Sequence, residues 1–214
     1  MEFREFAGYI DVYPERIEGT SQWFYCQCTP CGEAYEVPEY NGNYMGTRLY
    51  IFNIDGDVFE PISQKKNVFI DAPVFSNERH SFGIILYDFN QSVIQAFEYF
   101  PKQEKLSLLV EIPISKAGDL VNVRIVKEPF ILVKHDVHNN GVDFLWPVER
   151  HYQFEENESL CFIDGETLIT SKWIEDPNYR EEIIFRQVST GNIVKRKAGL
   201  IVEMPNGEKW LMTE

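Results

Sequence analysis

Residues 49–60 read LYIFNIDGDVFE, and the pattern of this stretch recurs along the whole chain. It begins with four apolar residues of aromatic and branched type, which fit a pleated and half-buried strand. Asp55-Gly56 follows, a dipeptide that accepts the positive φ angles of a type I′ hairpin turn. Val58-Phe59 follows after one further residue, Asp57. The stretch therefore predicts two antiparallel strands joined by a tight turn.

The same pattern extends in both directions. Further strands are predicted at residues 9–13, 23–26, 82–87, 93–100, 106–114, 121–126, 130–133, 183–185, 200–202 and 210–212. Further hairpin turns are predicted at Asn140-Gly141, Asp164-Gly165 and Asn206-Gly207, with a variant at Pro30-Cys31-Gly32. Residues 93–100 could pass for a helix, but their strand-like neighbours favour a strand. No long segment has a helical period, so the fold class is all-β.

The two halves of the chain share turn residues at a constant spacing. Three pairs are each 109 positions apart: Gly32 and Gly141, Pro38 and Pro147, Gly56 and Gly165. The closing segment 108–113 also resembles 200–205. Glycine and proline have backbone demands that other residues meet poorly, so a diverged duplication should keep them.

These matches predict two tandem antiparallel β-sandwich or small-barrel repeats, related by a pseudo-twofold axis. The first and longer repeat covers residues 1–116, and the second and shorter one covers 117–214. Each has a normal size for such a fold. The alternative is a small β-propeller, in which each half supplies two four-stranded blades.

Composition limits the class of partner. The 214 residues include 34 acidic and 20 basic side chains, for a net charge of −14, and 44% are hydrophobic. A negative field repels phosphate backbones and anionic lipids, so neither nucleic acid nor a membrane is an expected partner. A basic partner is compatible with the charge, although solubility explains it equally well. Residues 1–6 lack a basic start and apolar run, which favours a cytoplasmic protein with reduced cysteines.

One cysteine motif could hold a metal. Cys26, Cys28 and Cys31 form C-x-C-x-x-C, and thiolates this close could bind zinc with a fourth ligand. The 109-residue offset aligns this hairpin with His135 and His138, which would complete a mixed site if the two hairpins met. The competing interpretation is that these cysteines are small buried hydrophobes, since only one C-x-x-C-like fragment is present. Zinc is the only cofactor that the sequence suggests.

Other candidate chemistry is weaker. Cys161 lies in an apolar run and is predicted to be core. Paired carboxylates could cleave glycosides with aromatic platforms beside them. The candidates are Asp55, Asp57, Glu60, Asp164 and Glu166, with Trp23, Trp146, Trp173 and Trp210 as platforms. Their competing interpretation is that Asp55 and Asp164 are ordinary turn residues.

The sequence shows no catalytic signature and assigns no catalytic residue. It favours a non-enzymatic binding or protein-interaction module, with an unknown protein or small ligand as its partner. The alternatives are a metal-binding protein or carbohydrate-active enzyme that uses the hairpin side chains, and an acidic inhibitor or immunity-type protein that masks a basic partner.

Overall fold

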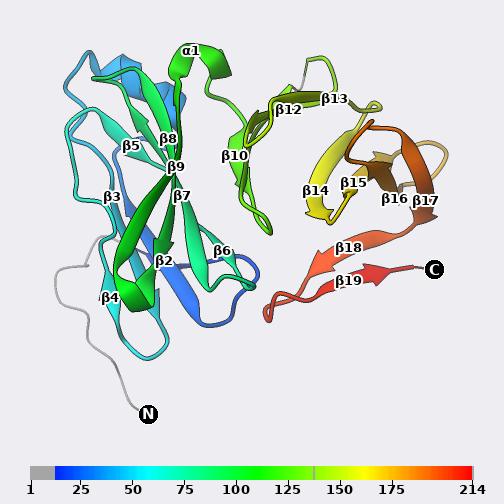
Figure 1. The fold of residues 1–214 in the computed structure, drawn as a ribbon, viewed down its shortest axis with the longest axis horizontal. Coiled ribbons are helices and arrows are strands. Elements are labelled where there is room, and N and C mark those ends of the chain that lie inside the picture. The colour runs from blue at the N-terminus through cyan, green and yellow to red at the C-terminus, as the bar shows by residue number, and fades with distance from the viewer. Residues whose placement is uncertain (1–12, 137, 214) are drawn as a thin grey trace.

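A computed structural model of the protein describes residues 13–136 and 138–213. These residues form an all-β molecule of antiparallel sheets, as predicted (Figure 1). The described strands build four sheets and one separate hairpin. Within each, the strands are neighbours in chain order, except that β6 pairs with β7 at one side. The predicted strand at residues 9–13 lies outside the described residues apart from Tyr13.

The first half of the chain forms two sheets. Sheet 1 consists of β1 (Glu15–Arg16), β2 (Trp23–Cys28), β3 (Arg48–Asn53) and β4 (Val58–Phe59). Sheet 2 consists of β5 (Val68–Ile70), β6 (Val74–Ser76), β7 (Ser81–Asp88), β8 (Val93–Phe100) and β9 (Lys105–Pro113). The described part of this half also contains three short helices: η1 (Ala34–Tyr40), η2 (Pro101–Gln103) and α1 (Ile114–Ala117).

The second half forms two more sheets and a hairpin. Sheet 3 consists of β10 (Val123–Val126), β11 (Ile131–Asp136), β12 (Gly141–Trp146) and β13 (Arg150–Gln153). Sheet 4 consists of β14 (Glu158–Asp164), β15 (Thr167–Ile174), β16 (Arg180–Gln187) and β17 (Ile193–Ala198). The terminal hairpin pairs β18 (Leu200–Glu203) with β19 (Lys209–Met212).

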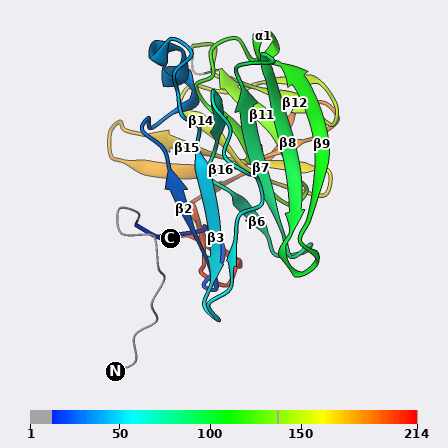
Figure 2. The same ribbon diagram turned by 90° about the vertical axis from the view of Figure 1, so that its left-hand side faces the viewer.

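The four sheets form a curved stack in chain order, with a hydrophobic core between each pair of neighbours (Figures 1 and 2). Strand β7 shows why. Its residues Phe82, Ile84 and Leu86 point into the core shared with sheet 1, while Ile85 and Tyr87 point into the core shared with sheet 3. Successive side chains of a strand face opposite sides, so a sheet covered on both faces reads as a continuous apolar run.

Sheet 3 repeats this arrangement. Leu132 on β11 points toward sheet 2, whereas its neighbours Ile131 and Val133 point toward sheet 4. Gly83 on β7 allows sheets 2 and 3 to approach, since a Cβ there would lie 3.0 Å from the Phe130 ring. The core between sheets 2 and 3 thus contains residues from both sides of the predicted boundary at 116/117, and the division into two domains stays a prediction.

The anchors of the predicted repeat occupy mixed backbone settings. Gly56 and Gly165 are equivalent, because both have positive φ in a turn between two paired strands. Gly32 lies in a bend before η1, whereas Gly141 is the first residue of β12. The duplication is therefore unconfirmed.

The expected hairpin turn at Pro30-Cys31-Gly32 is wrong. Strands β2 and β3 do pair, but residues 29–47 connect them through η1. Cys31 and Val37 are buried in the core between sheets 2 and 3. Packing of this connection onto the core overrides the local turn signal.

Candidate functional site

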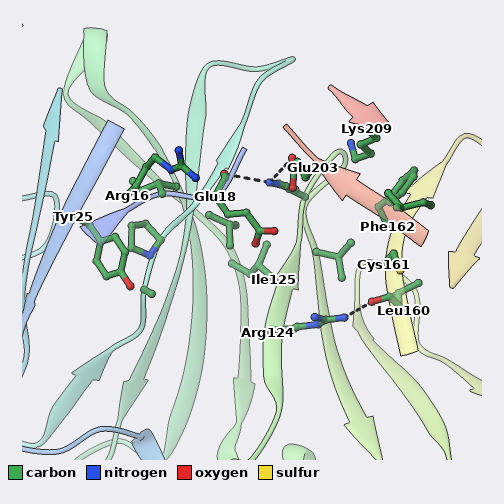
Figure 3. Close-up of a pocket in the computed structure, with 17 residues that line it drawn as sticks. Arg16, Glu18, Tyr25, Arg124, Ile125, Leu160, Cys161, Phe162, Glu203 and Lys209 are labelled. Carbon is green, nitrogen blue, oxygen red and sulfur yellow. Dashed lines mark hydrogen bonds and ion pairs between the residues drawn. The ribbon is translucent and has the colours of Figure 1, made fainter. Parts of the chain in front are cut away.

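A cavity of about 520 Å³ lies where the sheets and the terminal hairpin converge (Figure 3). We call it the inter-sheet cavity. Its walls come from every layer: Arg16, Ile17, Glu18 and Tyr25 from the sheet 1 region, Ala72, Pro73 and Val74 from sheet 2, residues 124–127 from sheet 3, residues 160–162 from sheet 4, and Ile201, Glu203 and Lys209 from the hairpin. Its volume lies in the range of small-molecule sites.

The charge of the cavity wall is opposite to that of the protein. Four cationic side chains and two carboxylates line it, for a net charge of +2, although the whole chain carries −14. The six are Arg16, Arg124, Lys127, Lys209, Glu18 and Glu203. A cavity with a positively charged wall attracts negatively charged ligands, because its low-dielectric walls concentrate the electric field.

Two of the cations are already neutralised. Lys127 Nζ lies 2.8 Å from Glu203 Oε1, and both side chains are largely buried. Gly19 leaves room for this pair, since a Cβ there would lie 2.4 Å from the same carboxylate oxygen. Lys209 Nζ lies 3.2 Å from Glu128 Oε2 and 4.6 Å from the centre of the Phe162 ring.

Arg124 is the most constrained cation of the wall. Its Nη2 donates to the Leu160 carbonyl oxygen at 2.5 Å and lies 2.9 Å from His135 Nε2. The side chain has exposed surface, but this surface faces a concavity, and burial among protein atoms lowers the pKa of Arg124. The nearby Glu18 charge opposes that shift.

A β-bulge places Cys161 at the cavity. Leu160 pairs with Thr170 and Phe162 pairs with Ile169, which leaves Cys161 as the extra residue of β14. Its side chain is half-buried on the cavity wall and is not the core residue that we expected. Burial raises the pKa of the Cys161 thiol to about 11, so it is a neutral thiol at physiological pH.

The predicted cysteine cluster lies elsewhere. Cys26 and Cys28 are on β2, and Cys26 is buried. Cys31 is buried in the bend before η1. Burial raises the pKa of Cys26 to about 11 and also raises that of Cys28. Cys26 and Cys28 are therefore neutral thiols at physiological pH.

The two predicted histidines lie together but apart from Cys26 and Cys28. His135 and His138 both line a second cavity of about 330 Å³ beside Asp119, Asp136 and Asp143. His135 is in sheet 3, whereas Cys26 and Cys28 are in sheet 1. Across residues 13–136 and 138–213, no three His, Cys, Asp or Glu side chains are grouped to hold a metal ion. The mixed Cys/His zinc site stays a prediction.

The candidate carboxylates belong to two different sheets. Asp55 and Asp57 lie in the β3–β4 turn of sheet 1 and Glu60 directly follows β4, whereas Asp164 and Glu166 lie at the β14–β15 turn of sheet 4. All five are exposed. Of the four tryptophans, Trp173 and Trp210 are exposed, and Trp23 and Trp146 pack against the cores.

The sequence could not reveal the inter-sheet cavity. Its charged residues are spread from Arg16 to Lys209, and no local motif connects them. The one available signal was Arg124, a charged residue inside the predicted strand at residues 121–126. In the described part of the chain, no helix is long and apolar enough to span a membrane.

No protein-family model matches the chain, and no curated protein matches its sequence. Similar solved structures include a chain of a mitotic checkpoint complex, with 12% identity and a TM-score of 0.40. The match covers 92% of this chain and 59% of that chain. A second is dipeptidyl peptidase 4 of Porphyromonas gingivalis, with 10% identity, a TM-score of 0.44, and a match over 89% of this chain and 32% of that one. A third is a prolyl endopeptidase, with 14% identity, a TM-score of 0.40, and a match over 92% of this chain and 38% of that one. The chain spans less than two thirds of each. Identities and scores this low transfer no function, which must follow from the chain's own side chains.

Proposed function

We propose that the protein is a non-enzymatic binding module that docks a partner protein on the outer face of the terminal hairpin. The observation that carries this proposal is a group of exposed apolar side chains. Leu200, Val202, Trp210 and Met212 are 38%, 38%, 49% and 50% exposed. Leu200 pairs with Met212 and Val202 pairs with Trp210, so all four share one face.

The hairpin is anchored on one face and open on the other. Ile201, Glu203 and Lys209 point to the inter-sheet cavity, while the alternate residues carry the apolar face. The described residues give this sheet two strands, where the other four sheets have four or five. A two-stranded hairpin is marginally stable in water, so a partner strand or surface would stabilise it. Tryptophan and methionine are enriched at protein interfaces.

Charge favours one kind of occupant for this face. Each copy of the chain carries −14, so a second copy would be repelled. A basic protein would be attracted, and its association would be accelerated by the opposite charge. We therefore propose a basic partner that presents an apolar segment to Trp210 and Val202. An acidic inhibitor of a basic enzyme is a special case, which would also block that enzyme's activity.

We also propose that the stack is a series of blade-like units. Four sheets of consecutive antiparallel strands support the propeller alternative better than two separate sandwiches, because a third core joins sheets 2 and 3. Such an array presents its connecting hairpins and its last sheet to partners. The hairpin face fits that use.

The test is co-purification followed by direct titration. Val202→Asp with Trp210→Ala removes the proposed contact, and Val194→Asp with Trp173→Ala is the matched control on exposed residues of sheet 4. A basic protein is expected to be recovered with the intact chain and with the control. After its purification, the hairpin variant should bind it at least about tenfold more weakly, as expected of a buried tryptophan anchor.

Two outcomes contradict the proposal. One is equal affinity of the partner for the hairpin variant and for the control. The other is sedimentation of the intact chain as a dimer that the hairpin variant converts to monomer, which would make a second copy the occupant. Affinity of the basic partner should also fall as salt is raised.

A further inference from the structure

Among the residues that the structure describes, Arg124 in the inter-sheet cavity contacts no anionic side chain. Lys127 and Lys209 are paired with Glu203 and Glu128. Within the described chain, Arg124 makes contacts with the Leu160 carbonyl and with His135, neither of which carries a negative charge. Arg124 also keeps exposed surface that faces the cavity, so its guanidinium is accessible to a ligand. The wall therefore holds a guanidinium whose counter-charge the described side chains do not supply at contact distance.

The guanidinium is also held in a fixed position. One nitrogen of Arg124 is tied to β14 at the Cys161 bulge and to His135 on β11. Burial and the nearby Arg124 charge lower the pKa of His135 to about 4, so this ring is neutral at physiological pH and can accept the hydrogen bond. A guanidinium fixed by neutral acceptors keeps its remaining donors available, and its planar fork matches a carboxylate or phosphate.

The other residues of the cavity wall indicate which further groups a ligand would carry. Arg16 is exposed on the sheet 1 side of the cavity and adds positive charge across from Arg124 (Figure 3). Ile125, next to Arg124 on β10, and Phe162, whose ring centre lies 4.6 Å from Lys209 Nζ, provide apolar surface on the same cavity wall. Glu18 is exposed on the same wall and can accept a hydrogen bond from a ligand hydroxyl or amino group.

We propose that the inter-sheet cavity binds a small organic anion, with its carboxylate or phosphate on Arg124 and its apolar part against Ile125 and Phe162. Arg16 strengthens the attraction from the opposite wall. This site goes beyond the docking function proposed above, because it uses the inner face of the terminal hairpin. The cavity volume of about 520 Å³ accommodates such a molecule.

Calorimetric titration of the intact chain tests the site. Benzoate and phenyl phosphate are the anionic probes, and benzyl alcohol is the neutral control of similar shape. Arg124→Gln removes the charge and keeps a donor, while Arg180→Gln is the matched control on an exposed arginine of sheet 4. At least one anion should bind more tightly than benzyl alcohol, and Arg124→Gln should weaken it at least about tenfold, the loss expected of a hydrogen bond to a charged group.

The relative affinities of the two anions tell a carboxylate site from a phosphate site. Equal binding of the anions and benzyl alcohol would overturn the proposal, as would equal affinities of the Arg124 and Arg180 variants. If Arg124→Gln does not fold, the His135 ring resonance in the intact chain decides, since an anion on Arg124 must shift it and no shift overturns the site. The hairpin variant Val202→Asp with Trp210→Ala should keep anion binding, which separates this result from the docking test.

Discussion

Glu158 and Arg186 form a buried ion pair that joins the first and third strands of sheet 4. Arg186 Nη2 lies 2.6 Å from Glu158 Oε2, and Arg186 Nε donates to Oε1 at 2.7 Å. The Glu158 side chain is 0% exposed and that of Arg186 is 7% exposed. Thr170 Oγ1 also donates to Glu158, so the intervening strand β15 is part of the network. Because the Glu158 carboxylate is fully buried, water could not replace these hydrogen-bond donors if one of them were removed.

Glu158→Gln should therefore destabilise the protein strongly. It leaves the Arg186 charge buried without its counter-ion, which typically costs about 3–5 kcal/mol. The free energy of unfolding from denaturant titration measures this. Glu149→Gln is the control, because the exposed Lys116–Glu149 pair should contribute no more than about 1 kcal/mol. Similar losses in the two variants would show that the Glu158 network does not stabilise sheet 4.

Gly46 should be far less replaceable than Gly42. Both have positive φ, at +94° and +77°. A Cβ on Gly42 would meet nothing within 4 Å, whereas a Cβ on Gly46 would lie 2.0 Å from the Lys65 carbonyl oxygen. Gly42→Ala should cost about 1 kcal/mol from the left-handed conformation alone. Gly46→Ala should cost about 2 kcal/mol more, since the backbone at Lys65 must move. Equal melting temperatures of the two variants would contradict this.

Asp71 should weaken the fold at neutral pH. Burial is the main cause that raises its pKa from 3.8 to about 6, and the Glu33 charge adds to it, against a hydrogen bond from the Ala72 amide. The folded state thus binds the proton more tightly than the unfolded state, so stability falls as pH rises from about 4 to above 6. Asp71→Asn should raise the free energy of unfolding at pH 7 by about 2 kcal/mol, and this gain should vanish below pH 4.

The contribution of Glu155 to stability should change with pH in the direction opposite to that of Asp71. Hydrogen bonds from Arg196 and Lys172 lower its pKa from 4.5 to about 2. Its contribution is therefore present above pH 4.5 and is lost as pH falls toward 2. Glu155→Gln should destabilise the protein at pH 7 and have no effect near pH 2. Denaturant titration of both variants at a series of pH values measures the two slopes, and slopes of the same sign would contradict the assignment.

Local chemistry predicted much of the fold. The turns at Asp55-Gly56 and Asp164-Gly165 and the strand at residues 93–100 are confirmed, because dipeptide geometry and apolar alternation act over a few residues. The stacking of the sheets depends on which face of each strand meets which neighbour, and residues 82–87 are apolar on both faces. An apolar run of this kind predicts that both faces of the strand are buried, but not which sheet covers each face.

The candidate site was largely hidden from the sequence. Cys161 lies in an apolar run, and a bulge that no local signal announces turns it to the cavity wall. Arg124 and Leu160 are 36 positions apart and meet through the packing of sheet 3 against sheet 4. His135 was predicted as a metal ligand on the basis of the repeat, whereas in the structure it contacts Arg124. The positions of Cys161, Arg124 and His135 depend on how the sheets pack, which local sequence does not encode.

The chain order of the sheets has a consequence for synthesis on the ribosome. Each sheet is made of consecutive strands, so it can form once its own residues have emerged, without waiting for distant segments. Each core then closes when the following sheet arrives, and the nascent chain grows as a stack from sheet 1 toward sheet 4. The cavity wall is completed only when Lys209 has been translated. A ligand that needs the full wall would therefore discriminate chains that extend beyond Lys209 from shorter nascent chains.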